Sequence, residues 1–299
     1  MRKYRFVILA LLVFSVGLLN ADYEGETGFQ MLQLTTGAAQ AGMAGTGMMY
    51  ADNAFVIWDN PAAGLMNSNR SFGVDQNFWI FDTSLTSVAY SNNKGNMHFG
   101  IGAKYLDYGK IEQRDASGDE IGEYHPMDIE MSMNWGVRLA ASHLVGVNVS
   151  YIYEKLDTAS SWGGTADVGY IYKTPIRGTN LYATVKNLGA TSKVEEENID
   201  LPMTAEAGIT NLVELEQIVF SSDIRATKEF ENEFRAAFGV EASYSGLFFL
   251  RAGHKMNYDT EDFSFGAGVK LEMIGIDYAY IPHNDDTGSV SMVSINYKF

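Results

Sequence analysis

Apolar and polar residues alternate with a period of two through most of the chain, and this pattern constrains the fold more than any other feature. In residues 97–105, for example, Phe99 and Ile101 alternate with Gly100 and Gly102. A period of two is that of a β-strand, whose successive side chains point to opposite faces of a sheet. The sequence therefore predicts an all-β protein.

The alternation recurs often enough to predict the architecture as well. It is found in fourteen segments: 71–80, 83–91, 96–106, 128–140, 143–155, 162–173, 180–187, 202–211, 216–227, 233–244, 247–256, 263–272, 274–281 and 289–299. Many are long enough for a tilted strand to cross a bilayer, and an even number of strands brings both ends of the chain to the same side of the membrane. We therefore expect a transmembrane antiparallel outer-membrane β-barrel of about 14 strands.

The connections between the segments give an independent check. Every second connection is short, such as Ser245-Gly246, and the others are longer and carry most of the acidic charge, such as residues 107–127. Short periplasmic turns and longer external loops are typical of outer-membrane barrels. The first connection, near Phe81-Asp82, is an exception, which a misplaced strand end explains.

The amino-acid composition excludes several classes of function. The 299 residues carry a formal charge of −16, with 37 acidic and 21 basic residues, so no nucleic-acid partner is expected. The chain has no cysteine, which excludes disulfides, thiolate nucleophiles and cysteine-held metal clusters. We predict no cofactor. The 17 Tyr, 17 Phe and four Trp residues supply the aromatic girdles of a membrane barrel.

The first residues have the pattern of an export signal. Arg2, Lys3 and Arg5 precede an almost wholly apolar run over 6–19, and the composition turns polar after Ala21. The apolar run is short for a membrane span, which disfavours an uncleaved anchor. We predict a signal peptide over 1–21. Together with the strands, it predicts a protein of the cell outer membrane that is in contact with outer-membrane lipid.

Residues 22–70 lack strand alternation, and we interpret them as a hatch inside the barrel, which then covers 71–299. A run of small residues over 37–47 suits a backbone that packs closely against a wall, and Asn60-Pro61 indicates a turn. The glycines of this run lack the strand and helix that a nucleotide-binding loop requires. The candidate hatch or ligand-binding residues are Trp58, Asn60, Pro61, Gly64, Gly42 and Gly45.

The last strand ends in an aromatic residue. Val293, Ile295, Tyr297 and Phe299 share one face of the segment that closes the chain. Such an ending resembles the signal by which the barrel-assembly machinery recognises its substrates. We predict that these four residues act as this signal and that the machinery is a partner during biogenesis.

Several segments together resemble one known family. They are 28–47, 51–54, 58–65, 181–189, 201–202, 251–255, 265–269, 276–280 and 295–299. In this set the chain is similar to PorV/PorQ-type outer-membrane proteins, a FadL-like β-barrel family, with one extra alanine in Asn60-Pro61-Ala62-Ala63-Gly64. The resemblance implies a fourteen-stranded barrel with an N-terminal hatch. It also implies one of two roles, partnership with type IX secretion or passage of hydrophobic molecules; the chain is short for the secretion shuttles.

The residues of a catalytic or metal site are not grouped in the sequence. The five histidines, namely His98, His125, His143, His254 and His283, lie in different segments, and no nucleophile elbow accompanies them. The acidic loop residues, Asp115, Asp119 and Glu120 or Asp259, Glu261 and Asp262, lack the ligand spacing of an EF-hand. We predict no enzyme activity and no metal site, and leave open whether the acidic loops bind calcium.

Three functional hypotheses follow. The first is a non-enzymatic scaffold or shuttle of the PorV/PorQ type, associated with type IX secretion components or client proteins. The alternative is a FadL-like channel for uptake or export of a hydrophobic small molecule. The third hypothesis is a soluble exported β-sandwich that binds a ligand. The identity of ligand or client and the oligomeric state are not encoded in any motif that we recognise.

Overall fold

The computed structural model describes residues 27–49, 51–67, 70–193, 199–229, 234–283 and 288–299. The predicted signal peptide and residues 22–26 lie outside this range. The elements are η2 (Gln30–Gln33), α2 (Ala38–Ala41), η3 (Ala54–Ile57), η4 (Ala63–Met66), β1 (Arg70–Phe78), β2 (Ser84–Lys94), β3 (Met97–Asp107), β4 (Ile111–Arg114), β5 (Glu120–Tyr124), β6 (Met127–Ala140), β7 (His143–Lys155), β8 (Ser160–Lys173), β9 (Thr179–Thr191), β10 (Thr204–Leu215), β11 (Ile218–Glu229), β12 (Phe234–Tyr244), β13 (Phe248–Met256), β14 (Phe263–Leu271), β15 (Ile274–Pro282) and β16 (Ser289–Lys298).

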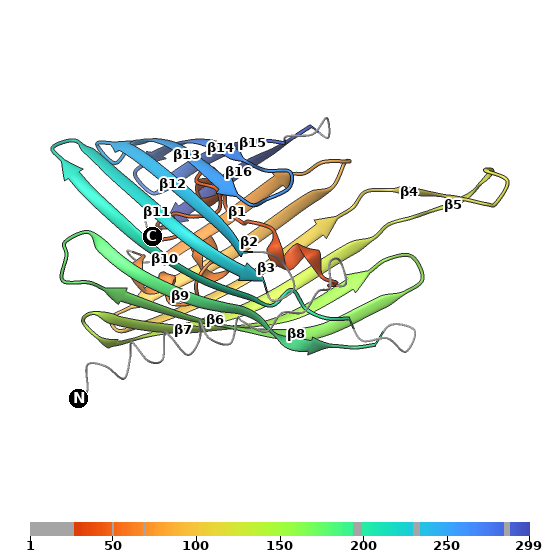
Figure 1. Ribbon diagram of the computed structural model, residues 1–299, viewed down its shortest axis with the longest axis horizontal. Coiled ribbons are helices and arrows are strands. Elements are labelled where there is room, and N and C mark those ends of the chain that lie inside the picture. Colours follow the sequence, from red (N-terminus) through yellow and green to blue (C-terminus); the bar gives the residue numbers. More distant parts are fainter. Residues whose placement is uncertain (1–26, 50, 68–69, 194–198, 230–233, 284–287) are drawn as a thin grey trace.

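Fourteen of these strands form one closed antiparallel barrel (Figure 1). Consecutive barrel strands are neighbours throughout, and β1 pairs with β16 to close the ring. The predicted fold class is thus confirmed, and a closed ring excludes the two-sheet sandwich. Closure leaves no unpaired edge, which is the arrangement that a sheet needs in lipid.

The alternation sorts side chains between the two surfaces of the barrel. On β16, Ile295 is 51% exposed on the outside, while its neighbour Ser294 is 1% exposed on the inside. The outer surface carries large apolar side chains on every barrel strand, and the inner surface carries mostly Ser, Thr, Asn, Gly and charged residues. No helix among the described residues is long and apolar enough to span a membrane.

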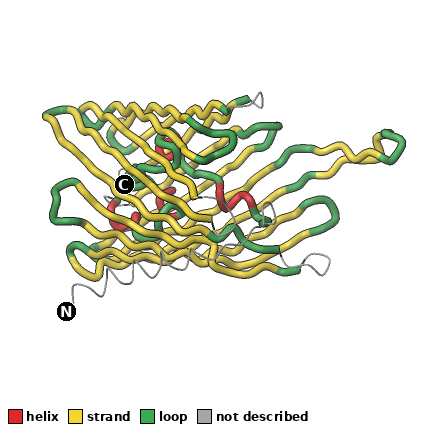
Figure 2. Tube along the Cα trace, in the orientation of Figure 1, coloured by secondary structure: helices red, strands yellow, loops and turns green. Residues whose placement is uncertain are grey.

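Residues 27–49 and 51–67 lie inside the ring of strands and are called the N-terminal segment below (Figure 2). The segment consists of short helical turns and irregular backbone, and most of its residues are buried. The helix α2 packs against β14, β15 and β16, whereas η3 and η4 pack against β1, β2, β3 and β6. The core of the molecule is therefore the contact between this segment and the inner wall.

One predicted loop is wrong in part. Residues 107–127 contain the strands β4 and β5, which pair as a hairpin that extends beyond the barrel (Figure 1). Asp115 Oδ1 accepts hydrogen bonds from the backbone N–H groups of Ser117 (2.8 Å) and Asp119 (3.0 Å), which forms the turn of this hairpin. The strands were missed because their residues are charged and exposed on both faces, so no alternation marks them.

Two strand ends also differ from the prediction. β9 extends to Thr191 rather than ending at residue 187, and β10 extends to Leu215, so that the periplasmic turn lies at 216–217. At Asn187 the backbone has φ +61°, and the pairing of β8 with β9 shifts register between Ala166 and Val168. A bulge of this kind breaks the two-residue period and hides the continuation of the strand.

Candidate functional site

The first half of the N-terminal segment, residues 37–47, is bound through its backbone. Two serines on the inner face of the barrel, called the wall here, accept hydrogen bonds from backbone N–H groups of the segment. Ser294 Oγ accepts from Ala38 at 2.7 Å, and Ser264 Oγ accepts from Ala44 at 2.8 Å. Asp223 Oδ2 accepts the N–H of Gly47 at 2.8 Å, and Arg225 Nη1 donates to the carbonyl oxygen of Gly45 at 2.8 Å. Four wall side chains thus satisfy backbone groups that would otherwise be buried without partners.

Wall glycines give this backbone room to approach. Gly239, Gly253 and Gly266 lie on the inner faces of β12, β13 and β14. A Cβ on Gly253 would collide with the backbone of Met43 and Ala44, and a Cβ on Gly266 would lie 3.1 Å from the Cα of Gly42. The predicted residues Gly42 and Gly45 therefore both contact the wall.

The second half of the segment, residues 53–66, is bound through its own side chains. The Trp58 indole Nε1 donates to Ser132 Oγ at 2.8 Å, and Lys104 Nζ lies 4.7 Å from the ring centroid. Lys104 pairs with Glu130 at 3.1 Å, and Ser132 Oγ donates to Glu130 at 2.8 Å. A Cβ on Gly102 would overlap the indole, which thus packs closely against β3.

Asn60 and Pro61 also pack against glycines of the barrel wall, here on β7 and β8. Asn60 Nδ2 donates to Thr184 Oγ1 at 2.7 Å, and Asn60 Oδ1 accepts the backbone N–H of Ala62 at 2.9 Å. The side chain thus closes the turn predicted at this position and also binds β9. Side chains at Gly146 or Gly169, which are register partners on β7 and β8, would collide with Pro61 or Asn60.

Gly64, the remaining predicted residue, faces a buried histidine. A Cβ on Gly64 would collide with the ring of His98 on β3. The ring is hydrogen-bonded on both sides, from Nε2 to Ser91 Oγ at 2.7 Å and from Nδ1 to Asn134 Oδ1 at 2.9 Å. These bonds hold the ring in place, so that only glycine fits at position 64.

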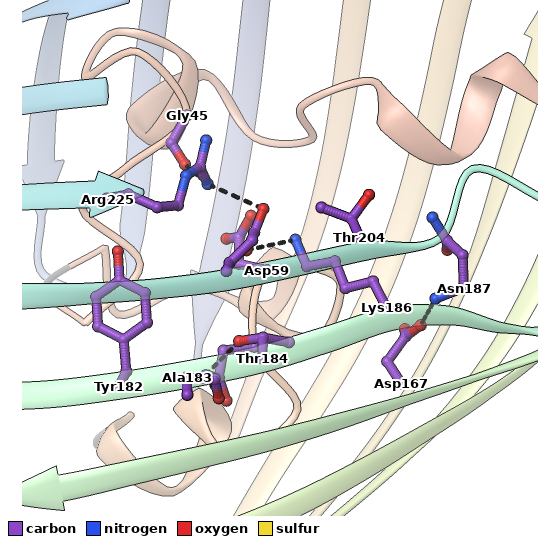
Figure 3. Close-up of polar contacts among 12 residues, drawn as sticks. Gly45, Asp59, Asp167, Tyr182, Ala183, Thr184, Lys186, Asn187, Thr204 and Arg225 are labelled. Carbon is purple, nitrogen blue, oxygen red and sulfur yellow. Dashed lines mark hydrogen bonds and ion pairs between the residues drawn. The ribbon is translucent and has the colours of Figure 1, made fainter. Parts of the chain in front are cut away.

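A charged cluster lies between the two halves of the segment. Lys186 and Arg225 project from β9 and β11 toward Asp59 of the N-terminal segment (Figure 3). Glu206 pairs with Lys186 at 3.1 Å and with Arg225 at 3.8 Å, and Asp59 accepts a hydrogen bond from Gln40 Nε2 at 3.1 Å. Burial raises the pKa of Asp59 from 3.8 to about 6, although the positive charge of Lys186 opposes the shift.

Two cavities lie at the end of the lumen where β9, β11 and β13 end. The smaller cavity has a volume of about 50 Å³ and lies at the edge of the segment. Its lining includes Leu34, Trp79 and Phe263. The larger, about 350 Å³, is lined by Thr27 and Gln33 of the segment, Asn187–Gly189 of β9, residues 200–203 and Glu229. It lies where β9 has separated from β10, whose pairing ends at Lys186 and Thr204.

The sequence did not reveal the wall residues of this site. The alternation separates glycines such as Gly100 and Gly102 from the apolar face, but it identifies none of them as the partner of a particular residue of the N-terminal segment. Runs such as Gly266-x-Gly268 and Gly100-x-Gly102 are a usable signal, since a strand rarely places glycine at alternate positions without a close neighbour. No group of three or more acidic, histidine or cysteine residues placed to hold a metal is present in the described part of the chain.

The predicted assembly residues all face outward. Val293, Ile295, Tyr297 and Phe299 are exposed on the outer surface, and Tyr297 and Phe299 meet edge-to-face with centroids 5.1 Å apart. The backbone N–H of Phe299 donates to the carbonyl oxygen of Arg70, the first residue of β1. These contacts are compatible with the predicted signal but do not test it.

The comparisons with known proteins concern the fold. Neither a protein-family model nor a curated protein sequence matches the chain. Among solved structures, the monoaromatic hydrocarbon channel CymD superposes with a TM-score of 0.66 at 13% identity, over 88% of this chain and 97% of the other. The chain therefore shares the fold of this channel.

Two further structures agree with this assignment. The toluene transporter TodX of P. putida gives a TM-score of 0.63 at 12% identity, over 88% of this chain and 98% of TodX. A Pseudomonas aeruginosa FadL homologue gives 0.58 at 11% identity, over 89% and 99%. The FadL-like part of the predicted resemblance is thus supported, whereas the narrower PorV/PorQ assignment stays a prediction.

Proposed function

We propose that this FadL-like barrel is a channel through which a hydrophobic small molecule crosses the outer membrane. The observation that carries the proposal is the superposition of nearly the whole barrel and its lumen on structures named as hydrocarbon and toluene channels. This was the alternative hypothesis from the sequence, and it now takes precedence over the secretion scaffold.

The cavity of about 350 Å³ is the entry site in this proposal. Its volume falls within the ~300–1,000 Å³ typical of small-molecule pockets. Leu188, Leu201, Pro202 and Met203 supply apolar surface, so that a hydrophobic molecule loses contact with water when it binds there. Thr27 and Gln33 of the N-terminal segment form another side of the same cavity, which connects ligand binding to the segment.

Passage beyond this cavity requires the N-terminal segment to move. Phe55, Ile57 and Asn60 belong to the segment, and their side chains are fully buried where the segment packs against the wall. A hydrophobic ligand that competes with these contacts lowers the cost of displacing the segment, because a ligand shifts an equilibrium by its differential affinity for the two states. The segment is therefore the gate in this proposal, and the channel performs no covalent chemistry.

The type IX scaffold hypothesis keeps the status of a prediction. Its distinguishing feature would be a surface for secretion components or clients, and no contact among the described residues identifies one. The long β4–β5 hairpin is available to a partner but carries no pattern that specifies which.

The proposal is tested by uptake into cells whose outer membrane contains the protein. Initial uptake of a labelled monoaromatic hydrocarbon is compared with that of a sugar of similar size, in cells with and without the chain. The proposal predicts several-fold faster hydrocarbon uptake and unchanged sugar uptake. Unchanged hydrocarbon uptake, or equal acceleration of both solutes, would contradict a hydrophobic channel.

A further inference from the structure

The barrel closes at the seam between β1 and β16, which no local turn specifies. Asp75 of β1 and Ser294 of β16 are register partners although they are 219 residues apart. Every other pair of neighbouring barrel strands is joined by a connection no longer than that between β3 and β6, whereas β1 and β16 lie at opposite ends of the barrel sequence. Such long-range pairing pays its loop-closure entropy before contacts compensate for it.

The N-terminal segment contacts this seam first at Asp75. Ser294 Oγ donates a hydrogen bond to Asp75 Oδ1 at 2.5 Å and accepts one from the backbone N–H of Ala38 at 2.7 Å. Both wall residues are at most 1% exposed. One buried hydroxyl group therefore joins β1, β16 and the N-terminal segment.

The second contact lies one inward-facing position further along β1. A Cβ on Gly73 would lie 2.6 Å from the ring of Phe55 and 2.8 Å from Asn296 Oδ1. Gly73 and Asn296 are register partners across the seam. The Phe55 ring therefore covers the junction of the two strands, and only glycine leaves room for it.

The third contact lies at the next inward-facing position of β1, Ser71, whose partner across the seam is Lys298. The ammonium group of Lys298 pairs with Asp52 of the N-terminal segment. Lys270 Nζ of β14 lies 3.7 Å from the same carboxylate. The side chain of Asp52 thus links the segment to the penultimate residue of the chain.

We propose that the N-terminal segment has a second function, as an internal clamp on the β1–β16 seam. Three consecutive inward-facing positions of β1, at Ser71, Gly73 and Asp75, each have a partner on β16, and at all three levels the segment touches the seam. The segment thereby supplies the local contacts that a hairpin turn supplies elsewhere. The clamp stabilises closure whether or not the lumen conducts a ligand.

The test compares two buried side chains of the segment. Phe55→Ala removes a ring at the seam, while Ile57→Ala removes a side chain of the same helical turn that packs against Gly100 of β3, away from the seam. Each variant is combined with cysteines at Val74 and Ile295, which are outward-facing register partners across the seam. Register partners lie at Cα distances that a disulfide spans, and the natural chain has no cysteine to interfere.

The readout is the temperature at which the folded barrel loses its fast mobility on detergent gels. We expect Phe55→Ala to lower this temperature by about 10 °C, from the usual cost of a large-to-small core change. The seam disulfide should raise it several degrees more in Phe55→Ala than in Ile57→Ala or the natural chain. A control disulfide between Val240 and Ala252 of β12 and β13, also register partners, should raise all three equally.

If the seam disulfide raises this temperature equally in Phe55→Ala, in Ile57→Ala and in the natural chain, the clamp is contradicted, because contributions that are independent of each other add. If Phe55→Ala does not assemble, Asp52→Asn replaces it in the same comparison, since it removes only the charge that faces Lys298. The clamp then predicts a smaller loss with the same preferential recovery by the seam disulfide. Absence of that preference would count equally against it.

Discussion

The two halves of the N-terminal segment are held in the lumen by opposite means. In residues 37–47 the wall supplies the side chains and the segment supplies backbone, as in the contacts of Ser264 with Ala44 and of Asp223 with Gly47. In residues 53–66 the segment supplies side chains of its own, chiefly Trp58 and Asn60. The first half therefore depends on the inner wall, and the second half depends equally on its own sequence.

This difference has a consequence for motion. Residues 37–47 bury mainly small apolar side chains, such as Ala38 and Ala41 against β15 and β16, so their release costs the hydrogen bonds and the exposure of a modest apolar area. The second half also buries Phe55, Ile57 and Trp58, which adds the cost of exposing apolar surface. We expect the first half to leave the wall first when the channel opens.

The largest expected effect is a wall substitution that affects the first half alone. Gly253→Val on β13 places a side chain into the backbone of Met43 and Ala44, and overpacking of this kind costs roughly 1–3 kcal/mol. We predict that the open fraction rises about tenfold or more, measured as open probability in a planar bilayer.

The matched control for this prediction is Gly275→Val on β15. A Cβ at Gly275 has no atom closer than Asn296 Cβ at 4.0 Å. The control should therefore leave conductance unchanged. Equal conductance of the two variants would show that the first half is not seated on the wall glycines.

An intermediate effect is expected in the second half. Asn60→Ala removes the hydrogen bond to Thr184 and leaves buried partners unsatisfied, at a cost of roughly 1–3 kcal/mol. Thr184→Ala breaks the same bond from the wall side. We predict strong coupling in the thermal stability of the two single variants and the double variant; additive losses would mean that the two side chains act independently.

The smallest expected effect is a pH dependence at the boundary between the halves. The pKa of Asp59 is about 6 when the segment is docked and 3.8 in its ordinary state. The docked state thus binds the proton more tightly, so docking is strongest below about pH 4 and weakens as the pH rises to about 6. Lys186, Arg225, Glu206 and Gln40 surround the carboxyl group.

Asp59→Asn should remove this component of the pH dependence, because the amide does not titrate. The measurement is protection of the segment from hydrogen exchange between pH 4 and pH 7, corrected for the intrinsic exchange rate. The natural chain should lose protection across this interval more than the variant. Identical profiles would assign the dependence to the other buried carboxylates of the wall.

The wall was predictable from the sequence because its signal is local. On strands such as β7 and β14, most outward apolar residues are followed by an inward Gly, Ser or Asn, and contact with lipid favours this alternation on every strand. The exceptions are informative. The β4–β5 hairpin lies in water on both faces and Asn187 interrupts the period, so in neither place does burial leave a pattern.

The contacts of the segment were not predictable, since each joins residues far apart in the chain. Asn60 was identified as a turn residue, and that role depends on Ala62, two residues away. Its second role depends on Thr184, which is 124 residues away. In the same way Gly42 was predicted to be a site of close approach, while its partner Gly266 on β14 was not identified as the residue that it approaches. A single sequence shows that a residue such as Gly42 is small, but it does not show which distant residue packs against it.

The central claim is that hydrophobic molecules pass only when the N-terminal segment leaves the wall, and a reversible lock tests it most directly. Ala44 N and Ser264 Oγ are 2.8 Å apart, so cysteines at these two positions are within reach of a short bis-methanethiosulfonate cross-linker, which joins both thiols through reducible disulfides and releases sulfinate, and no other thiol is present. We predict that the joined protein loses hydrocarbon uptake in cells and that reduction or reagent removal restores it in the same sample. Uptake that is equally fast with the segment joined and released would contradict the account.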